Sequence, residues 1–374
     1  MQVLYRKYRP KTFEEVEGQE HVVRTLQGAL VSGRVGHAYL FCGPRGTGKT
    51  TMARLLAKTL NCTSLQFTVV SGQSKFDKLK TENWKLKTAP QEPCNICHSC
   101  TEINEGRSMD LIEIDAASNR GIDEIRNLKD SARVAASSSV NKVFIIDEVH
   151  MLTPPAFNAL LKILEEPPSH VIFILATTEP HKVPDTILSR VQRFYFKKIS
   201  VEKIKSRLAA IAQKEKVRVD DEALAMLAFS ASGSLRDAES AFNKIIAYAG
   251  TEGSISPETV AEILGIVPLQ VHDSLINLIL AKKTQEVISQ INDLHEAGTD
   301  LNNFLKQFVR HLRTKLVGLI GDSPYIVTAA ASASQMTPEF LIKSINAFMK
   351  ASNEIKLSPI PQLPIELAIL ELTK

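Results

Sequence analysis

Short apolar runs rich in β-branched residues alternate with helical segments between "HAYLFCG" and "RFYFKKI". Such runs are typical of buried strands, and strands that alternate with helices indicate a parallel α/β sheet. We therefore expect strands in "AYLFC" (38–42), "DLIEIDA" (110–116), "KVFIIDE" (142–148) and "VIFILATT" (171–178).

The β pattern ends near Ser200, a residue type that often caps the N-terminus of a helix. The next segment, "VEKIKSRLAAIAQK", places four apolar residues on one helical face: Val201, Ile204, Leu208 and Ile211. Further helices, each opened by Asp or Ser, are expected in "DDEALAMLAFSA", "SLRDAESAFNKIIAYA" and "SPETVAEILG". This part of the chain is predicted to be a small helical domain.

The remaining sequence is also helical in pattern, and Pro268 marks its beginning. "DLNNFLKQFVRHLRTKLVGLI" has apolar residues at helical spacing, namely Leu301, Leu305, Phe308, Leu312, Leu316 and Leu319. The pattern predicts an α/β domain at 1–199, a helical domain at 200–266 and a helical packing or assembly domain at 267–374.

The composition is that of a soluble globular protein, with 44% hydrophobic residues, 23% charged residues and a net charge of +4 over 374 residues. This charge mildly favours anionic partners but does not by itself indicate nucleic-acid binding. The longest apolar runs, such as "VFII" and "VIFILA", fall far short of a membrane span. The N-terminus lacks the apolar region of an export signal, so we expect a cytoplasmic protein.

The segment "GPRGTGKT" matches the phosphate-binding P-loop pattern G-x-x-x-x-G-K-[ST], between an expected strand and the expected helix "KTTMARLLAKTL". Its glycines let backbone N–H groups approach phosphates, Lys49 adds a positive charge, and the Thr50 hydroxyl can hold Mg²⁺. The alternative is a Gly-rich turn without a ligand. The predicted nucleotide-binding residues here are Gly43, Pro44, Arg45, Gly46, Thr47, Gly48, Lys49, Thr50 and Thr51.

Two strand ends and two loops supply further candidate residues. "VFIIDEVH" ends an apolar strand in Asp147, which could orient Mg²⁺, and Glu148, which could polarise the attacking water; the alternative is a solvated strand end. The hydroxyls of Thr177 and Thr178 in "LATTEP" could contact a γ-phosphate or only cap a strand. Single arginines stand in "ILSRVQRF" and "GSLRDAES", where they are either surface charges or stabilisers of charge on a γ-phosphate.

Three of the five cysteines lie at two-residue gaps in "PCNICHSC". An odd, clustered set suits a metal in a reducing compartment better than a disulfide framework. A tetrahedral site needs a fourth ligand, for which Cys42, Cys62 and His98 are candidates. Cys42 directly precedes the P-loop, where coordination would draw the metal into the phosphate site, and His98 is awkwardly placed next to Cys97.

In this order, the motifs resemble those of AAA+ ATPases, and among them the gamma/tau subunits of the bacterial DNA polymerase III clamp loader. The resemblance covers essentially the whole chain. It is carried by "YRKYRPKTFEEVEGQEHV", "GHAYLFCGPRGTGKTTMARLLAKTLNC", "CNICHSC", "DAASNRGIDEIR", "IDEVHMLTPPAFNALLKILEEPPSHVIFILATTEPHKVPDTILSR" and "GSLRDAES". A cysteine cluster beside a P-loop is the discriminating combination.

The resemblance implies roles for individual residues. Thr178 corresponds to the sensor-1 residue, Arg190 to an arginine finger that acts on a neighbouring subunit, and Arg236 to the sensor-2 arginine of the helical lid. Val191 stands where the family's finger motif has a cysteine. The residues at the position where the family cradles adenine are Tyr8, Arg9 and Pro10.

By the same resemblance, Cys62 is the first zinc ligand, and Cys42 is a small buried residue outside the site. The implied structural Zn²⁺ site, in a module at about 62–100, comprises Cys62, Cys94, Cys97 and Cys100. The 31 residues at 63–93 are a polar, Lys-rich insertion where family members have a short loop. Closing a longer loop costs entropy only logarithmically, so the site tolerates the insertion.

The implied function is that of an ATP- and Mg²⁺-dependent subunit that assembles with other clamp loader subunits through a C-terminal collar. It would open the sliding clamp and place it on primed DNA, with Arg120 and Arg126 contacting phosphates without sequence preference. It would belong to the DNA-directed DNA polymerase holoenzyme, although no polymerase active site is visible. Alternatives are a non-hydrolysing ATP switch and a Holliday-junction branch-migration motor. Longer family forms continue beyond the position of residue 374.

Overall fold

The computed structural model describes residues 3–64, 92–249, 254–320 and 337–374. Most of the insertion at 63–93 lies outside these residues. The chain divides into two compact units, Met1–Ile255 and Ser256–Lys374, and each is described by itself. The predicted domain boundary at 266/267 is not tested by this division and stays a prediction.

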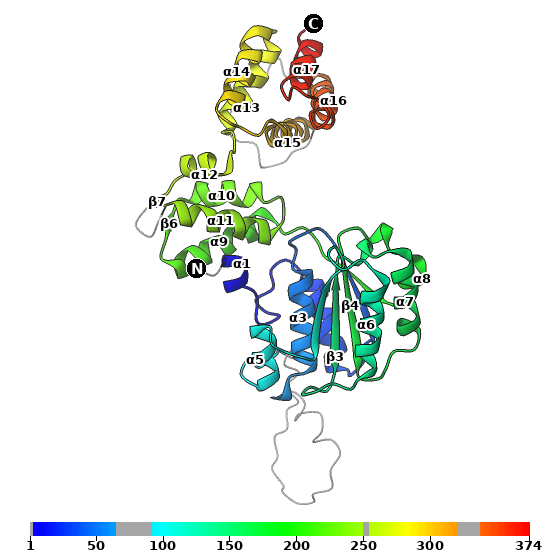
Figure 1. Ribbon diagram of the computed structural model, residues 1–374. Helices are drawn as coiled ribbons and strands as arrows, with labels where there is room; N and C mark the ends of the chain where they lie inside the picture. Colours follow the sequence, from blue (N-terminus) through cyan, green and yellow to red (C-terminus); the bar gives the residue numbers. More distant parts are fainter. Residues whose placement is uncertain (1–2, 65–91, 250–253, 321–336) are drawn as a thin grey trace, which may run out of the picture. The chain divides into compact units, whose positions relative to one another are not determined.

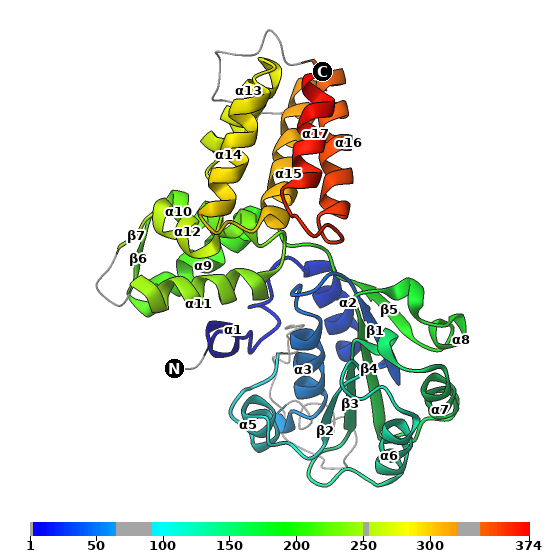
Figure 2. The ribbon, with the colours of Figure 1, turned by 45° about the horizontal axis from the view of Figure 1, so that its top comes forward.

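In the described part of the first unit, five parallel strands form one sheet (Figure 1), in the order β2-β3-β4-β1-β5 (Figure 2). The strands are β1 (Ala38–Cys42), β2 (Leu111–Asp115), β3 (Lys142–Asp147), β4 (Val171–Thr177) and β5 (Gln192–Tyr195). All four strands predicted from apolar runs are confirmed. The register pairs Cys42 with Thr177 and Asp115 with Asp147, so the carboxyl ends of β1 to β4 meet at one edge.

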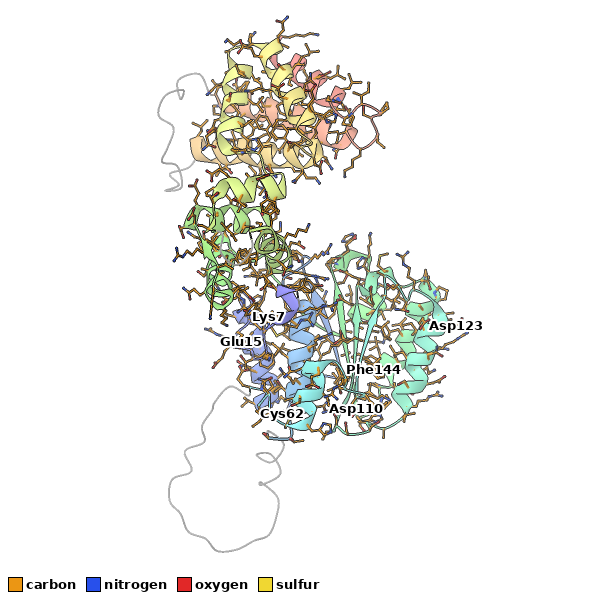
Figure 3. The ribbon with its side chains drawn as sticks, turned by 60° about the vertical axis from the view of Figure 1, so that its left-hand side comes forward. Lys7, Glu15, Cys62, Asp110, Asp123 and Phe144 are labelled. Atoms are coloured by element: carbon orange, nitrogen blue, oxygen red, sulfur yellow. The ribbon has the colours of Figure 1, made fainter. Side chains whose placement is uncertain are left out.

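Helices cover both faces of this sheet, because alternate strand residues point to opposite sides. Tyr39 and Phe41 pack on the face covered by α2 (Glu20–Val31) and α3 (Lys49–Leu60). Leu40, with the stacked pair Phe144 and Phe173, packs on the other face (Figure 3). The helices over that face are α6 (Ile122–Arg133) and α7 (Pro154–Glu165).

Shorter elements complete this part of the fold, and two of them, η1 and η2, directly follow the carboxyl ends of β3 and β4. The shorter elements are α1 (Leu4–Lys7), α5 (His98–Glu105), η1 (Val149–Met151), η2 (Pro180–Lys182) and α8 (Asp185–Leu188). The element η1 begins directly after Glu148, whose φ of 48° is in the left-handed region. This turn redirects the chain as soon as β3 ends.

A group of helices that we call the lid completes the first unit, consisting of α9 (Val201–Glu215), α10 (Asp221–Ser230) and α11 (Leu235–Ala249). The Ser200 hydroxyl accepts a hydrogen bond from the Lys203 N–H, which confirms the predicted N-cap. The expectation that all β structure ends at Ser200 is wrong. Two short strands, β6 (Arg218–Val219) and β7 (Ser254–Ile255), pair in parallel and bury Ile255.

The described part of the second unit is helical (Figure 2). Its helices are α12 (Pro257–Leu264), α13 (Leu269–Leu280), α14 (Thr284–Glu296), α15 (Leu301–Ile320), α16 (Pro338–Glu354) and α17 (Leu363–Thr373). Leu301, Leu305, Phe308 and Leu312 of α15 are buried as predicted, but Leu319 is 47% exposed near the end of the helix. Among the described helices, none is both long and apolar enough to cross a bilayer.

Candidate nucleotide site and cysteine cluster

The P-loop connects β1 to α3, and two of its glycines, Gly43 and Gly46, have no room for a side chain. A Cβ at Gly46, which has a φ of 73°, would lie 1.9 Å from the Ser234 hydroxyl oxygen. The Leu235 N–H donates to the Gly46 carbonyl over 3.1 Å, so the first turn of lid helix α11 rests on the loop. Gly48 caps α3 in the left-handed conformation, so the N-terminus of α3 opens at the loop, where phosphate binding is favourable.

Lys49 is buried at the start of α3, and its Nζ donates to the carbonyls of Gly43 and Pro44 over 2.8 and 2.9 Å. Burial lowers the pKa of this ammonium, while the carboxylates of Glu148 and Asp147 oppose that shift. The charge therefore lies inside the loop that would surround a phosphate.

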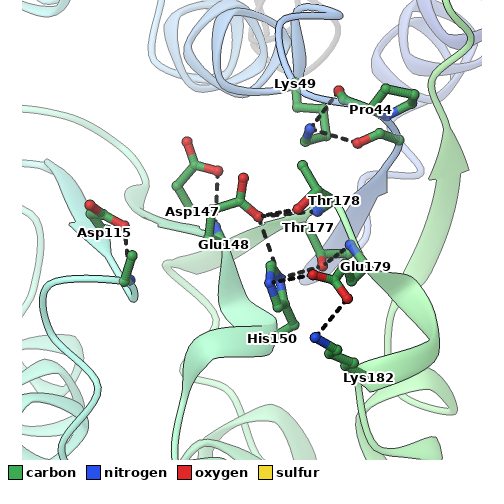
Figure 4. Close-up of polar contacts among 12 residues, drawn as sticks. Pro44, Lys49, Asp115, Asp147, Glu148, His150, Thr177, Thr178, Glu179 and Lys182 are labelled. Carbon is green, nitrogen blue, oxygen red and sulfur yellow. Dashed lines mark hydrogen bonds and ion pairs between the residues drawn. The ribbon is translucent and has the colours of Figure 1, made fainter. Parts of the chain in front are cut away.

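A hydroxyl and a carboxylate meet beside Lys49 at the sheet edge. The Thr50 hydroxyl donates to Asp147 Oδ2 over 2.7 Å. Oxygen ligands of this kind suit Mg²⁺, and the pair combines one residue of α3 with the last residue of β3. Glu148 lies next to them, with its Oε2 accepting hydrogen bonds from the Thr178 N–H and hydroxyl over 3.1 and 2.8 Å (Figure 4).

A cavity extends from the P-loop between the N-terminal segment and the lid. Its lining comprises Tyr5, Arg9, Pro10, Glu15, Val16, Glu17, Arg45, Gly46, Thr47, Gly48, Lys49, Thr50, Thr51, Asp147, Glu148, Arg207, Leu235, Arg236 and Glu239. The lining contains arginines that suit a polyphosphate, together with carboxyl groups such as Asp147 and Glu148 beside the P-loop. Arg236 therefore lies with the P-loop, as the resemblance implies for a sensor-2 residue.

Of the three N-terminal residues expected to cradle adenine, two line the cavity and one does not. Arg9 and Pro10 line the cavity, whereas the Tyr8 hydroxyl donates to Glu215 of the lid over 2.7 Å. Tyr5, one helical turn earlier, takes a place in the lining, with the Arg236 guanidinium 5.2 Å above its ring. The sequence reasoning missed Tyr5, and the i, i+3 spacing of the two tyrosines was the available signal.

A buried carboxyl group in the lid was also missed. Glu239 lies one turn after Arg236 on α11 and lines the cavity. Burial raises its pKa to about 7, although the nearby guanidinium of Arg207, at 3.7 Å, and that of Arg9 act in the opposite direction. Burial and then the neighbouring Arg54 lower the pKa of Arg9.

Arg190 is absent from the lining of this cavity. It follows α8, where its guanidinium donates to the Thr186 carbonyl over 2.8 Å and pairs with Glu165 at 2.7 Å. The side chain is partly exposed, beside Val191 in a shallow surface hollow. This placement would let it reach another molecule.

The two arginines expected at DNA also lie at the surface. Arg120 Nε donates to the Ala117 carbonyl over 2.9 Å, and Arg126 pairs with Asp123 at 2.9 Å one turn earlier on α6 (Figure 3). An exposed ion pair of this kind contributes little to stability, so Arg126 is available to other partners.

Four cysteine sulfurs lie close together beside the C-terminal end of α3. The Sγ atoms of Cys62, Cys94, Cys97 and Cys100 all lie within 4.8 Å of one another, and those of Cys94 and Cys100 are 3.9 Å apart. A Zn–S bond of about 2.3 Å in a tetrahedron requires sulfurs roughly 3.8 Å apart, so the set fits Zn²⁺. Cys42 lies elsewhere, buried in β1 beside Thr177.

Lys58, in the last turn of α3, joins this cluster to the nucleotide-binding lobe. Its buried Nζ donates to the Lys11 carbonyl and to the side-chain oxygens of Asn95 and Asn104 over 2.8, 2.6 and 2.9 Å. The helix that begins in the P-loop therefore ends against the cysteine module.

The environments of the thiols differ. Burial opposes ionisation of Cys94, but hydrogen bonds from the Ser64 hydroxyl and from the N–H groups of Ile96 and Cys97 outweigh it and lower its pKa to about 6. Burial raises the pKa of Cys100. His98 points away from the sulfurs into solvent and faces Glu102 at 3.5 Å.

Comparisons with family models match successive parts of the chain. Residues 18–83 and 73–200 match a model described as DNA polymerase III, delta subunit. Residues 203–251 match the ATPase lid domain of a DNA polymerase III clamp loader subunit. Residues 255–374 match domain III of the DNA polymerase III subunits gamma and tau.

The curated relatives are gamma and tau subunits of DNA polymerase III. The chain is 38% identical to DNA polymerase III subunit tau of Bacillus subtilis, covering 99% of this chain and 63% of that protein. Identity to subunit tau of Escherichia coli is 37%, covering 99% of this chain and 55% of the relative. DNA polymerase III subunit gamma of Buchnera aphidicola from Acyrthosiphon pisum is 38% identical, with 83% of this chain and 79% of the relative covered.

Solved structures are more distant. The Thermotoga maritima RuvB Holliday junction branch migration motor matches with a TM-score of 0.47 and 16% identity, covering 80% of this chain and 91% of that one. A Bacillus subtilis DNA clamp loader delta protein matches with a TM-score of 0.37 and 18% identity, covering 94% of this chain and 99% of that one.

The chain spans 55 to 63% of the length of the two tau relatives above.

Proposed function

Because the chain belongs to the family of DNA polymerase III gamma and tau subunits, we propose that it is an ATP-hydrolysing clamp loader subunit. It binds ATP in the P-loop cavity and uses the energy of binding and hydrolysis to open a sliding clamp and leave it on primed DNA. As part of a bacterial replication assembly, it acts in the cytoplasm. It contributes to the polymerase holoenzyme without a polymerase site of its own.

One observation carries the enzymatic part of this proposal. Lys49, the Thr50–Asp147 pair and Glu148 converge at the carboxyl edge of the sheet. Lys49 binds the phosphates, Thr50 and Asp147 would hold Mg²⁺, and Glu148 orients the attacking water. Bound Mg²⁺ neutralises charge on the phosphate oxygens. A non-hydrolysing switch has no need of Glu148 in this position, so hydrolysis is the better proposal.

The site is completed by a second subunit. Arg190 lies outside the cavity of its own chain, so we assign it to the cavity of a neighbour, where its guanidinium stabilises charge on the γ-phosphate. Thr178 and Arg236 act within the chain, at the water and at the phosphates. The guanidinium that would supply this chemistry is present although Val191 stands at the position of the family's cysteine.

The four cysteines hold one structural Zn²⁺. All four ligand positions are filled by protein, which leaves none for a catalytic water. When bound, the metal fixes the module onto the end of α3 near Lys58. The cluster has no role in a branch-migration motor, which disfavours that alternative.

The proposed partners are other loader subunits and primed DNA, and exposed side chains support both. Apolar side chains of α17, among them Leu363 and Leu367, are exposed and suit contacts with other loader subunits through the collar. Arg120 and Arg126 suit the phosphates of primed DNA, bound without sequence preference and with a strong dependence on salt.

The test is ATP turnover of the full chain, alone and with partner subunits, sliding clamp and primed DNA. We expect strong joint stimulation by clamp and DNA that is absent from a Lys49→Ala assembly. Turnover that clamp and DNA leave unchanged would remove the clamp-loading proposal, and turnover equal to that of Lys49→Ala would remove the ATPase proposal.

A further inference from the structure

A histidine with no assigned role lies directly behind Glu148. His150 belongs to η1, and its side chain is only 5% exposed. Its Nδ1 lies 3.4 Å from Glu148 Oε2 and 3.0 Å from the Thr177 hydroxyl oxygen (Figure 4). Its Nε2 lies 3.7 Å from Glu179 Oε1 on the other side of the ring. The ring therefore stands between two carboxylates.

The backbone conformation at Glu148 produces this arrangement. Glu148 is not a glycine, yet its φ is 48°, a conformation that costs free energy unless surrounding contacts maintain it. The turn brings the side chains of Glu148 and His150 to the same side, where β4 ends. The Met151 N–H closes the turn by donating to the Glu148 carbonyl over 2.9 Å.

Each ring nitrogen of His150 faces a carboxylate. The Thr177 hydroxyl oxygen beside Nδ1 also accepts the Glu179 N–H over 3.0 Å. The tautomer used in the proposal carries a proton on Nδ1, from where it points toward Thr177 and Glu148. Glu179, itself paired with Lys182 at 2.7 Å, bounds the ring at Nε2.

These contacts leave one carboxylate oxygen for chemistry. The Thr178 N–H and hydroxyl donate hydrogen bonds to Oε2 of Glu148, and His150 Nδ1 lies 3.4 Å from the same oxygen, at ion-pair distance. Oε1 is then the oxygen that can accept a hydrogen bond from the attacking water. A glutamate side chain has three rotatable bonds, so restricting its rotation raises the fraction of time in a reactive geometry.

We propose that His150 is a positioning residue for Glu148: its Nδ1–H fixes Oε2 so that Oε1 faces the water, and Glu179 sets the angle of the ring. This inference rests on the proposed ATPase function and deepens it. His150 is not among the residues that line the cavity. Its effect is therefore expected in the rate of hydrolysis and not in nucleotide affinity.

The experiment replaces His150 in the full chain, within the assembly stimulated by clamp and primed DNA. The amide nitrogen of His150→Asn can occupy the place of Nδ1, whereas that of His150→Gln reaches the place of Nε2. We expect kcat to fall about tenfold in His150→Ala and His150→Gln, less than the roughly 10² to 10⁴ that a general base contributes. His150→Asn should recover most of the rate, with Kd for ATP and KM unchanged throughout.

His170→Ala is the matched control, because His170 lies at the opposite end of β4 and contacts the Val134 carbonyl. It should retain full activity. The Asn and Gln variants keep a polar group in the pocket, so their comparison holds even when the alanine variant folds poorly. Equal losses in Asn and Gln, or a raised KM with unchanged kcat, would overturn the positioning role. A wild-type assembly without turnover would remove the proposed function and this inference together.

Discussion

Replacing Glu239 by glutamine is expected to stabilise the protein above neutral pH and to leave it unchanged in acid. Glutamine has the shape of the protonated acid but cannot ionise. The Glu239 carboxyl group is buried against Arg207, and burial raises its pKa from 4.5 to about 7. The folded state therefore binds this proton more tightly than the unfolded state does.

The sign and size of the effect follow from this difference. Stability contributed by protonated Glu239 is fully present below pH 4.5, the unfolded value, and is lost as the pH rises through about 7, the folded value. At about 1.4 kcal/mol per pKa unit, the loss amounts to roughly 3 kcal/mol. This is an upper value, because Arg207 has no anionic partner in the variant.

Urea denaturation of the full chain, followed by far-ultraviolet circular dichroism at pH 5 and pH 8, measures the difference. The transition of the unit Met1–Ile255 should shift to higher urea in Glu239→Gln at pH 8 and by much less at pH 5. Glu202→Gln, an exposed glutamate in the first turn of α9, is the control and should shift both curves by the same small amount, since only a helix-end charge is lost. A Glu239→Gln protein that is less stable at pH 8, or equally shifted at both pH values, would refute the reasoning.

Three further predictions concern the P-loop, Arg190 and the cysteine cluster. Lys49→Ala should abolish ATP binding, measured by fluorescent-nucleotide titration, since the loop loses its buried ammonium; wild-type affinity would contradict the P-loop assignment. Arg190→Ala should retain ATP binding but lower turnover by up to roughly 10³ to 10⁵-fold. In mixed assemblies the loss should follow the neighbouring site, and a loss confined to the mutated chain's own site would exclude action in trans. Cys62→Ser should lower zinc content measured by mass spectrometry while Cys42→Ser retains one equivalent; the reverse result would refute the ligand set.

Consecutive residues determined a large part of this protein. The P-loop could be recognised from sequence because its glycines, Lys49 and Thr50 are adjacent in the chain and their geometry depends on local backbone conformation. Buried strands were equally visible, since a strand covered on both faces must be apolar throughout. The Ser200 cap was found for the same reason, as its hydrogen bond spans only three residues.

The cysteine cluster could be predicted only in part from sequence spacing. The spacing of Cys94, Cys97 and Cys100 indicated a metal site from sequence alone. Sequence spacing could not choose a fourth ligand across a 31-residue insertion, and the choice of Cys62 came from a family resemblance. The folded chain brings Cys62 to the other three sulfurs because α3 ends beside the module.

Tertiary structure alone decided the contacts between residues that are distant in sequence. Tyr5 lines the cavity beneath Arg236 of α11, whereas Tyr8 donates to Glu215 of α9, because the two tyrosines face different helices of the folded lid. Leu319 is exposed although it follows the helical spacing of α15, because a helix can extend past the core that covers its apolar face.

The chemical properties of the site residues also depend on contacts with residues that are distant in the sequence. His150 contacts Thr177 and Glu179 because parallel strands bring their carboxyl ends together, and 27 residues separate the first pair. Glu239 acquires its raised pKa only in the folded chain, where burial removes its carboxyl group from water. A residue's type and its neighbours in the chain fix what it can do, but burial and distant partners decide what it does, because solvation and charge act through space.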